Sequence, residues 1–272
     1  MKAEHTSLQS SLPRRAGGWL RMQVTALLAS LQFLTLVPPV IRRPFRPGEL
    51  GRAVGYFPLV GAALGGLLAG MNLLLGACLH GGVTPALLVA AWVVLTGALH
   101  MDGFLDACDG LFGGHTPEAR LRILRDERVG AYGLAGGVLL LLLKYCALAA
   151  LPHPTAALIL APTLGRWGIS LALVAFPYAR QQGLGRAMKD HAGWRQAILA
   201  TVIALAATWF AAGSEGLAVL GVASAVMWAA ARFAQSRLSG LTGDIYGAIC
   251  ELVEVTVLLV LVALGGMNGI QP

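Results

Sequence analysis

Long apolar stretches separated by short polar links dominate the chain. Seven of these stretches approach the ~20 residues that an α-helix needs to cross about 30 Å of hydrocarbon. They occupy residues 53–79, 83–101, 131–151, 154–178, 197–212, 216–234 and 246–265. An eighth stretch, 24–41, ends in Pro38-Pro39, which cannot continue the interior of a regular helix. The pattern predicts an all-α, polytopic integral membrane helical bundle with about seven transmembrane helices.

The composition excludes a conventional soluble protein. Of the 272 residues, 57% are hydrophobic and only 12% are charged, which is about half the charged share of an average soluble domain. The mean hydropathy is +0.71. Most of the surface is therefore expected to face lipid, and the lipid bilayer is the first partner that the sequence predicts.

The net charge of +7 fits either nucleic-acid binding or the positive-inside rule of membrane proteins. The position of the charges decides, because the links at 80–82, 152–154 and 213–216 contain no Lys or Arg. The alternate connections are basic. They carry Arg120, Arg122, Arg125, Arg128, Arg180, Arg186, Lys189, Arg195, Arg232 and Arg237. The rule places them on the cytoplasmic side of a bacterial inner membrane, so no nucleic-acid partner is expected.

The stretch 24–41 departs from this regularity. Basic residues flank it on both sides, from Arg14 to Arg21 and from Arg42 to Arg52, so both flanks are expected in the cytoplasm. An ordinary crossing would violate the rule, whereas a re-entrant or interfacial segment satisfies both flanks. The sequence thus predicts such a segment near the N-terminus, after a polar tail at 1–22 and within a single membrane-embedded domain at 23–272.

Scarce acidic residues cluster after the second apolar stretch. Asp102, Asp106 and Asp109 stand at i, i+4 and i+7, which places them on one stripe of a helix. We expect them near the C-terminal end of the 83–101 helix, where mutual repulsion and the helix dipole both disfavour anions. A bound cation would remove both penalties, and carboxylate oxygens without clustered Cys or His suit Mg²⁺. The alternative is a solvated acidic face on a loop.

Small and basic residues surround the acidic stripe. Gly103 and Gly110 would let a ligand approach the backbone closely. Arg125 and Arg128, at i and i+3, are candidates to clamp phosphate or to pair with the carboxylates, although the positive-inside rule alone also accounts for them. His100 faces away from the stripe on a continuous helix and is expected to be a hydrogen-bonded structural residue rather than a metal ligand.

A second group of ionisable residues lies within the apolar stretches. Asp244 and Glu251 are seven residues apart on one helix face, and Glu254 lies a turn deeper. Ionisable groups at such depth cost at least ~2.5 kcal/mol and usually mark function. Arg166 is a candidate to pair with a carboxylate or to hold an anionic substrate, and Lys144 is expected to snorkel or to balance a buried acid. Asp244 is expected at the depth of the acidic stripe, so the two clusters are predicted to meet.

Several motifs of this chain are similar to those of a known family. They are Leu99-His100-Met101-Asp102-Gly103, Asp106, Asp109-Gly110, Asp126–Gly133, Gln32-Phe33-Leu34-Thr35, Tyr56–Gly61, Ala161–Arg166 and Leu241–Ala248. In this order, from about residue 28 to 262, they resemble the cobalamin synthase family, the adenosylcobinamide-GDP ribazoletransferases. The family usually carries an Arg where this chain has Leu36, so a phosphate role for that position would pass to Arg42 or Arg43.

The resemblance implies an integral membrane enzyme of the late steps of vitamin B12 assembly. It would transfer the cobinamide-phosphate part of adenosylcobinamide-GDP to α-ribazole or α-ribazole 5′-phosphate and release GMP, with Mg²⁺ as cofactor. The active site would face the cytoplasm, and a homo-oligomer is compatible with the sequence.

The chemistry of such a transfer assigns expected roles to the residues already singled out. Asp102, Asp106 and Asp109 would hold Mg²⁺ at the pyrophosphate. Asp106 or Asp244 would orient or deprotonate the attacking hydroxyl. The remaining candidates stabilise phosphates or bind substrate: Arg128 and Arg166 as catalytic cations, and Arg125, Gly103, Gly110 and Glu251 as substrate-binding residues.

Two other functions are compatible with parts of the sequence. A CDP-alcohol phosphotransferase-like membrane enzyme would use a similar Asp-rich motif, but the further Asp residues of that pattern are missing after Asp109. A cation-coupled transporter would explain Glu251 and Glu254 as ion relays. Transporters often contain internal repeats, and none is evident here.

Overall fold

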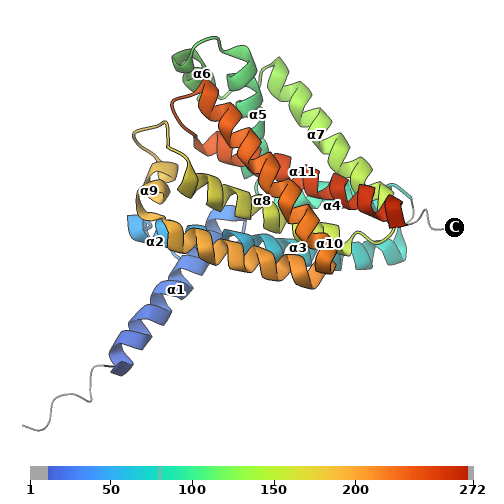
Figure 1. Cartoon of the computed structure of the whole chain (residues 1–272), viewed down its shortest axis with the longest axis horizontal. Helices are drawn as coiled ribbons and strands as arrows, with labels where there is room; N and C mark the ends of the chain where they lie inside the picture. The colour runs from blue at the N-terminus through green and yellow to red at the C-terminus, as the bar shows by residue number, and fades with distance from the viewer. Residues whose placement is uncertain (1–11, 80, 269–272) are drawn as a thin grey trace, which may run out of the picture.

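The computed structural model describes residues 12–79 and 81–268, which are largely helical (Figure 1). The helical elements are α1 (Leu12–Leu34), α2 (Pro47–Ala53), the 3-10 turn η1 (Val54–Tyr56), α3 (Phe57–Cys78), α4 (Val83–Leu95), α5 (Leu99–Gly113), α6 (Pro117–Ile123), α7 (Ala131–Ala150), α8 (Thr155–Ala175), α9 (Leu184–His191), α10 (Trp194–Arg237) and α11 (Gly243–Asn268). No β-strand occurs in the described ranges, where an isolated parallel bridge joins Tyr178 to Leu241. The all-α prediction is confirmed.

Five stretches within the described ranges are long and apolar enough to cross a membrane. They are Gly48–Cys78, Ala131–Ala150, Thr155–Ala175, Trp194–Arg237 and Gly243–Gly265. The bent pair of α4 and α5 makes a sixth if both helices belong to one span. Length and composition therefore support a polytopic membrane bundle, but they do not confirm the expected count of seven spans.

The count differs mainly because of α10, which runs for 44 residues. A straight helix of that length would extend ~66 Å, about twice the thickness of the hydrocarbon core. Gly213 interrupts it with non-helical φ and ψ angles of 53° and −135°. Figure 1 shows that the second limb turns back from this point. The two limbs correspond to the expected stretches 197–212 and 216–234.

α8 is the central helix of the bundle and packs against α3, α10 and α11. Glycines of α3 bring its backbone close to that of α8, since a Cβ on Gly65 would lie only 2.5 Å from the carbonyl oxygen of Leu158. Gly61 makes the same approach one turn earlier, against Pro162. Small residues four positions apart allow this close packing in membranes. α10 instead carries outward side chains such as Phe210, which is 88% exposed, as expected of a surface that faces lipid.

The expected helix 83–101 is broken, and this corrects the placement of the acidic stripe. α4 ends at Leu95 and α5 begins at Leu99, with a bend of 89° between them. Asp102 consequently lies in the first turn of α5. The prediction that the stripe sits at the C-terminal end of a helix is wrong, because the positive end of the α5 dipole favours an anion at Asp102.

The backbone at the break is held in an unusual conformation. Gly97 and Ala98 both have positive φ, at 60° and 55°. The N–H of Leu36 donates to the carbonyl oxygen of Leu95 at 3.0 Å, so the segment after α1 covers the end of α4. The bend therefore depends on contacts with a distant part of the chain as well as on local glycine.

α1 ends at Leu34, before Pro38-Pro39, as the sequence predicts. The helix already includes residues 12–22, which were expected as part of a polar tail, and residues 1–11 of that tail lie outside the described ranges. α1 does not meet the length and hydropathy criterion for a membrane span. A re-entrant or interfacial placement of 24–41 stays a prediction.

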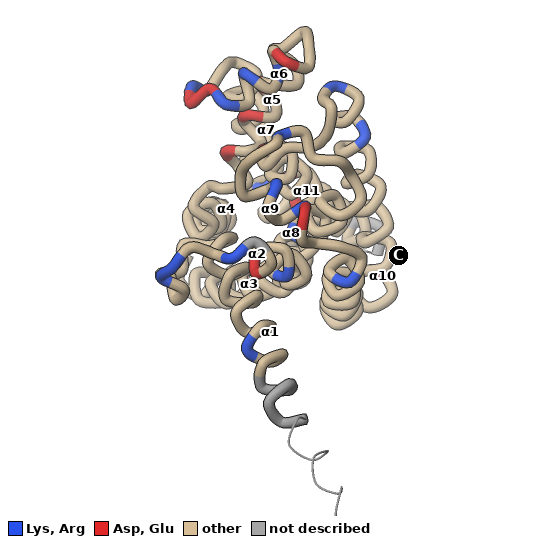
Figure 2. Tube along the Cα trace, turned by 90° about the vertical axis from the view of Figure 1, so that its left-hand side faces the viewer, with Lys and Arg blue, Asp and Glu red and all other residues tan. Residues whose placement is uncertain are grey.

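The basic connections and the links without Lys or Arg lie at opposite ends of the bundle. In Figure 1 the turn after α3, the turn between α7 and α8, and the bend of α10 lie at the right, whereas α6, α9 and the connection from α10 to α11 lie at the left and top. Figure 2 looks onto the latter side and shows charged residues on its loops and helix ends. We call this side the charged end, and its separation from the other end agrees with the predicted topology.

Candidate functional site

The acidic stripe forms on α5 as the spacing predicts. The opposite face of the helix is buried. Its buried residues are His100, Gly103, Phe104, Ala107, Gly110 and Leu111. Asp102 is exposed, while Asp106 and Asp109 are half-buried. The carboxylates of Asp102 and Asp109 lie close enough to Asp106 to repel its negative charge. One face of α5 thus presents three carboxylates at the charged end.

The start of α11 brings a fourth carboxylate, Asp244, to the same place. The two helices touch through glycines, because a Cβ on Gly103 would lie 3.0 Å from the Asp244 backbone, and one on Gly247 would lie 2.9 Å from the carbonyl oxygen of His100. The Asp244 carboxylate is near enough to repel that of Asp106. Of the second acidic group, the structure therefore brings only Asp244 to the stripe, whereas Glu251 and Glu254 pair with Lys144 and Arg166 in the interior.

Arg180 is the cation of this site, and the sequence singled it out only as a basic loop residue. Its Nη2 donates to Asp244 at 2.6 Å and to the carbonyl oxygen of Leu124 at 3.0 Å. Two backbone hydrogen bonds of 2.8 Å hold the loop that carries Arg180. The N–H of Leu241 donates to the carbonyl oxygen of Pro177, and the N–H of Ala179 donates to the carbonyl oxygen of Leu241. Nothing in the spacing distinguished Arg180 from its basic neighbours, because its role depends on a loop-to-loop contact over about 60 residues.

A cavity of about 300 Å³ lies between α5, the start of α11 and the 176–185 loop. Its polar lining includes Asp102, Arg180 and Asp244, and its walls are otherwise mostly apolar or aromatic. The rings of Tyr178 and Tyr246 stack at 6.0 Å between centroids. Burial raises the pKa of the Tyr178 hydroxyl, which therefore stays protonated at neutral pH. The cavity combines a flat aromatic surface with charged groups at its edge.

Asp109 does not contact this cavity but binds the start of α7. Its two carboxylate oxygens accept hydrogen bonds from the N–H groups of Gly130 (2.7 Å) and Gly133 (2.8 Å), at the start of α7. A Cβ on Gly130 would lie 2.5 Å from the carboxylate, so glycine is needed for this approach. Asp109 thus caps α7, where the helix dipole and free N–H groups favour an anion. Gly110, a predicted substrate-binding residue, packs against the side chain of Leu124.

Arg125 and Arg128 lie on an open surface cleft of about 780 Å³ beside α6. Arg128 pairs with Asp126 at 3.2 Å, and its side chain is 90% exposed. Such solvated ion pairs contribute little to stability. Both arginines are accessible to a charged ligand, and neither makes an ion pair with the acidic stripe among the described residues.

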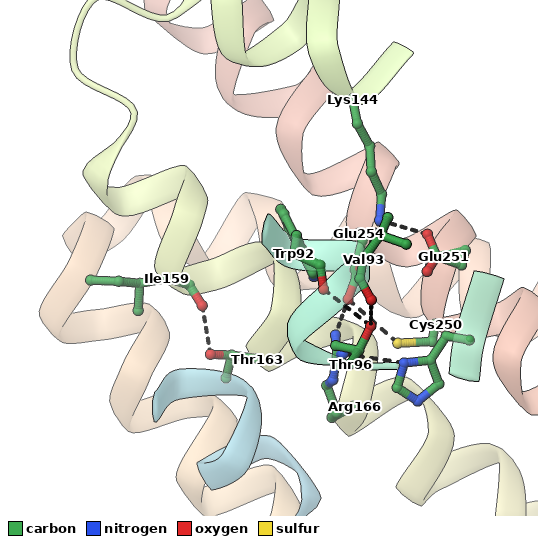
Figure 3. Close-up of polar contacts among 11 residues, drawn as sticks. Trp92, Val93, Thr96, Lys144, Ile159, Thr163, Arg166, Cys250, Glu251 and Glu254 are labelled. Atoms are coloured by element: carbon green, nitrogen blue, oxygen red, sulfur yellow. Dashed lines mark hydrogen bonds and ion pairs between the residues drawn. The ribbon is translucent and has the colours of Figure 1, made fainter. Parts of the chain in front are cut away.

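Arg166 and Glu251 are placed in the interior instead. Figure 3 shows Arg166 paired with Glu254, and Lys144 reaching both glutamates. The Nζ atom of Lys144 lies 2.5 Å from a carboxylate oxygen of Glu251 and 2.5 Å from one of Glu254. The second Arg166 nitrogen lies 3.2 Å from Nδ1 of His100. The predictions that Lys144 balances a buried acid and that His100 is a hydrogen-bonded structural residue are confirmed. We call these five residues the buried charge network.

The described residues contain no group of three His, Cys, Asp or Glu side chains placed to hold one metal ion. The expected set of Asp102, Asp106 and Asp109 is spread over two turns of α5, and the last of these caps α7. A metal at this site would accordingly need oxygen ligands from a substrate in addition to those of the protein.

Comparison with known proteins extends these observations. The model of the family described as cobalamin-5-phosphate synthase matches residues 26–262. The chain is similar to adenosylcobinamide-GDP ribazoletransferases from Deinococcus radiodurans (43% identity, covering 89% of this chain and 87% of the relative), Geotalea daltonii (40%; 87% and 96%) and Pseudomonas syringae pv. syringae (42%; 86% and 98%). No solved structure matches the chain at a significant level.

Proposed function

Because the chain belongs to the cobalamin-5-phosphate synthase family, we propose that it is an adenosylcobinamide-GDP ribazoletransferase. The reaction joins the cobinamide-phosphate part of adenosylcobinamide-GDP to α-ribazole or α-ribazole 5′-phosphate and releases GMP. The observation that carries the proposal beyond family membership is the meeting of Asp102, Asp106, Asp244 and Arg180 beside a cavity at the charged end. The positive-inside rule puts this end at the cytoplasmic face of the bacterial inner membrane.

The transfer is a substitution at phosphorus. The 3′-hydroxyl oxygen of ribazole attacks the phosphorus that stays on cobinamide. The bond from that phosphorus to the bridging oxygen breaks, and its electron pair leaves with GMP. A general base must take the hydroxyl proton, and a positioned carboxylate of this kind typically contributes about 10²–10⁴-fold to the rate.

Asp106 is the better placed of the two candidate bases. Asp244 is already bound by Arg180 and by the hydroxyl of Thr242, and this fixes its orientation. Asp106 has no hydrogen bond or ion pair to the described residues, and it faces the repulsion of neighbouring carboxylates. We therefore assign proton acceptance to Asp106 and orientation of the acceptor hydroxyl to Asp244.

Asp102 is the residue that would hold Mg²⁺, since Asp106 is assigned to the proton and Asp109 caps α7. One carboxylate, water and the phosphate oxygens of a substrate suit this ion, which rarely depends on protein ligands alone. When bound, Mg²⁺ supplies neutralisation of the charge that develops on the leaving GMP. Arg125 and Arg128 border the open cleft and are accessible to phosphates, whereas Arg166 is excluded from direct contact by its burial at 1% exposure.

The test uses the full-length protein purified into lipid nanodiscs. Wild-type protein supplied with adenosylcobinamide-GDP and α-ribazole is expected to release GMP in the presence of Mg²⁺ and to lose turnover with EDTA. Asp102→Asn should reduce GMP release at least 100-fold. Asp190→Asn is the matched control, since Asp190 lies on α9 and its ion pair among the described residues is with Arg186, one turn earlier on the same helix. Wild-type protein that forms no GMP from both substrates would contradict the proposed function.

A further inference from the structure

Resting on the proposed function, we infer that the 300 Å³ cavity between α5, α11 and the 176–185 loop binds the base and ribose of the acceptor nucleoside. Small-molecule sites typically span about 300–1,000 Å³. The cavity lies at the lower end of this range, which suits a single nucleoside. A corrinoid that carries a nucleotide is far too large for it, so the donor must approach from outside.

The walls of the cavity suit a flat, apolar base. Besides the tyrosine pair, two phenylalanines line it, Phe33 and Phe57, whose rings stack at 6.0 Å with 18° between their planes. Leu173 and Met188 add aliphatic surface. Offset stacking on aromatic rings contributes about 0.5–1.5 kcal/mol beyond the burial of area, and a bicyclic base presents such a face.

One polar group in the cavity lacks a partner. Tyr246 lines the cavity and is only 5% exposed, yet its hydroxyl has no hydrogen bond to the described residues. Burying a hydroxyl without a partner is costly, and native structures seldom leave one so. A ligand that offers an acceptor, such as the unsubstituted ring nitrogen of a nucleoside base, would complete this hydrogen bond. The unpartnered Tyr246 hydroxyl is a second observation, beside the acidic cluster, in favour of a ligand in this cavity.

The carboxylates at the edge of the cavity suit the sugar rather than the base. Asp102 and Asp244 can accept hydrogen bonds from ribose hydroxyls. Bound in this way, the ribose lies beside Asp106, whose charge interacts with both carboxylates. The acceptor hydroxyl would thus meet the base that removes its proton.

The guanine of the donor is a poorer occupant. Its edge carries several donors and acceptors, which would lose their water against the aliphatic walls of Leu173 and Met188. A bicyclic base with an apolar outer edge avoids this cost. The cavity therefore selects the acceptor over the nucleotide of the donor.

Two variants test the inference by steady-state kinetics in nanodiscs, with each substrate varied in turn. Tyr178→Leu removes one stacking ring and should raise KM for α-ribazole about tenfold. Tyr246→Phe removes only the unpartnered hydroxyl and should raise the same KM about three- to tenfold. KM for adenosylcobinamide-GDP should stay within twofold in both. Tyr145→Phe is the matched control, because its hydroxyl lies near Gly82, at the end away from the charges.

Equilibrium binding separates this inference from the proposed function. Titration calorimetry with α-ribazole, and separately with GMP, uses the Asp106→Asn protein, whose turnover is expected to be at least about 100-fold lower. Adding Tyr246→Phe should weaken the binding of α-ribazole and leave that of GMP unchanged. Weaker GMP binding, a raised KM for adenosylcobinamide-GDP, or no change with either substrate would overturn the subsite assignment and leave the function standing. Normal α-ribazole binding that weakens with Tyr246→Phe, in a protein that never forms GMP, would support the subsite and contradict the reaction.

Discussion

The two groups of charged residues in this bundle differ in how their charges are balanced. In the buried charge network, the cations of Lys144 and Arg166 face the anions of Glu251 and Glu254. No side chain of the four is more than 9% exposed. The network is complete within the protein, since every charge has an opposite charge in contact.

The group at the charged end is not complete. Asp102, Asp106, Asp109 and Asp244 lie near one another, and Arg180 is the cation that pairs with one of them. Repulsion among carboxylates is unfavourable unless a ligand or cation offsets it. The difference teaches that depth in the bundle is a poor guide to function here, because the deepest charges neutralise one another and the shallower ones remain available to substrate.

The largest effect is expected where the unbalanced group meets the chemistry. Asp106→Asn removes the proposed base and should lower kcat by about 10²–10⁴-fold, measured as GMP release. The midpoint of thermal unfolding should not fall, because the Asp106 carboxylate makes no hydrogen bond or ion pair to the described residues and its removal relieves repulsion by the neighbouring carboxylates. A near-normal kcat would remove Asp106 from the mechanism.

The balanced group should respond in the opposite way. Glu254→Gln leaves Lys144 and Arg166 facing one buried carboxylate, and an unpaired buried charge costs about 3–5 kcal/mol. Unfolding in detergent, followed by circular dichroism, should show this loss. The exposed Glu118→Gln is the control.

A double variant tests whether charge balance alone determines the stability of the buried charge network. Arg166→Met with Glu254→Leu removes one cation and one anion together and leaves Lys144 paired with Glu251. It should be more stable than either single variant, because replacing a whole buried pair by apolar residues is often neutral. A double variant less stable than both would show that the network does more than balance charge.

Asp109 is the member of the charged-end group whose carboxylate is already bound, by the N–H groups of Gly130 and Gly133, and its substitution tests whether it acts as a cap or as a metal ligand. Because Asp109 caps α7, Asp109→Ala should destabilise the protein by about 1 kcal/mol and reduce turnover less than tenfold. Thermal unfolding and GMP release measure the two effects. Loss of turnover as complete as that of Asp106→Asn would instead favour the metal ligand that the sequence predicts.

The smallest effect concerns the bend that separates α4 from α5. Ala98 has a φ of 55°, which glycine adopts more easily, so Ala98→Gly should stabilise the protein by about 0.5 kcal/mol. Gly97→Ala should destabilise it, because its Cβ would lie 2.8 Å from the side chain of Leu36. Equal destabilisation by both changes would mean that the left-handed backbone is not the determining feature.

The long apolar helices could be predicted closely from the sequence. α7, expected at 131–151, is observed at Ala131–Ala150, and α8, expected at 154–178, at Thr155–Ala175. Span length and flanking polar residues set these boundaries locally. The break at 96–98 was missed, because the apolar run continues through it and the bend depends on contacts with Leu36.

The candidate site likewise has features that the sequence predicts and features that it does not. The stripe on α5 follows from spacing alone, since 3.6 residues per turn put its members on one face. The cap by Asp109 joins residues 21 and 24 positions apart, and the pairing of Arg180 with Asp244 joins residues 64 apart. Such partners depend on how the helices pack, and no local pattern in one sequence encodes that.

The pairing of Arg166 with Glu254 has a consequence for the order of synthesis. The two residues are 88 positions apart, and at about 5–20 residues per second Glu254 is made roughly 4–18 s after Arg166. During this interval α8 carries a cation in an apolar environment without its partner, at a cost of at least ~2.5 kcal/mol. A helix made well after α8 therefore neutralises the core, and chains that stop before α11 should be poor at staying inserted.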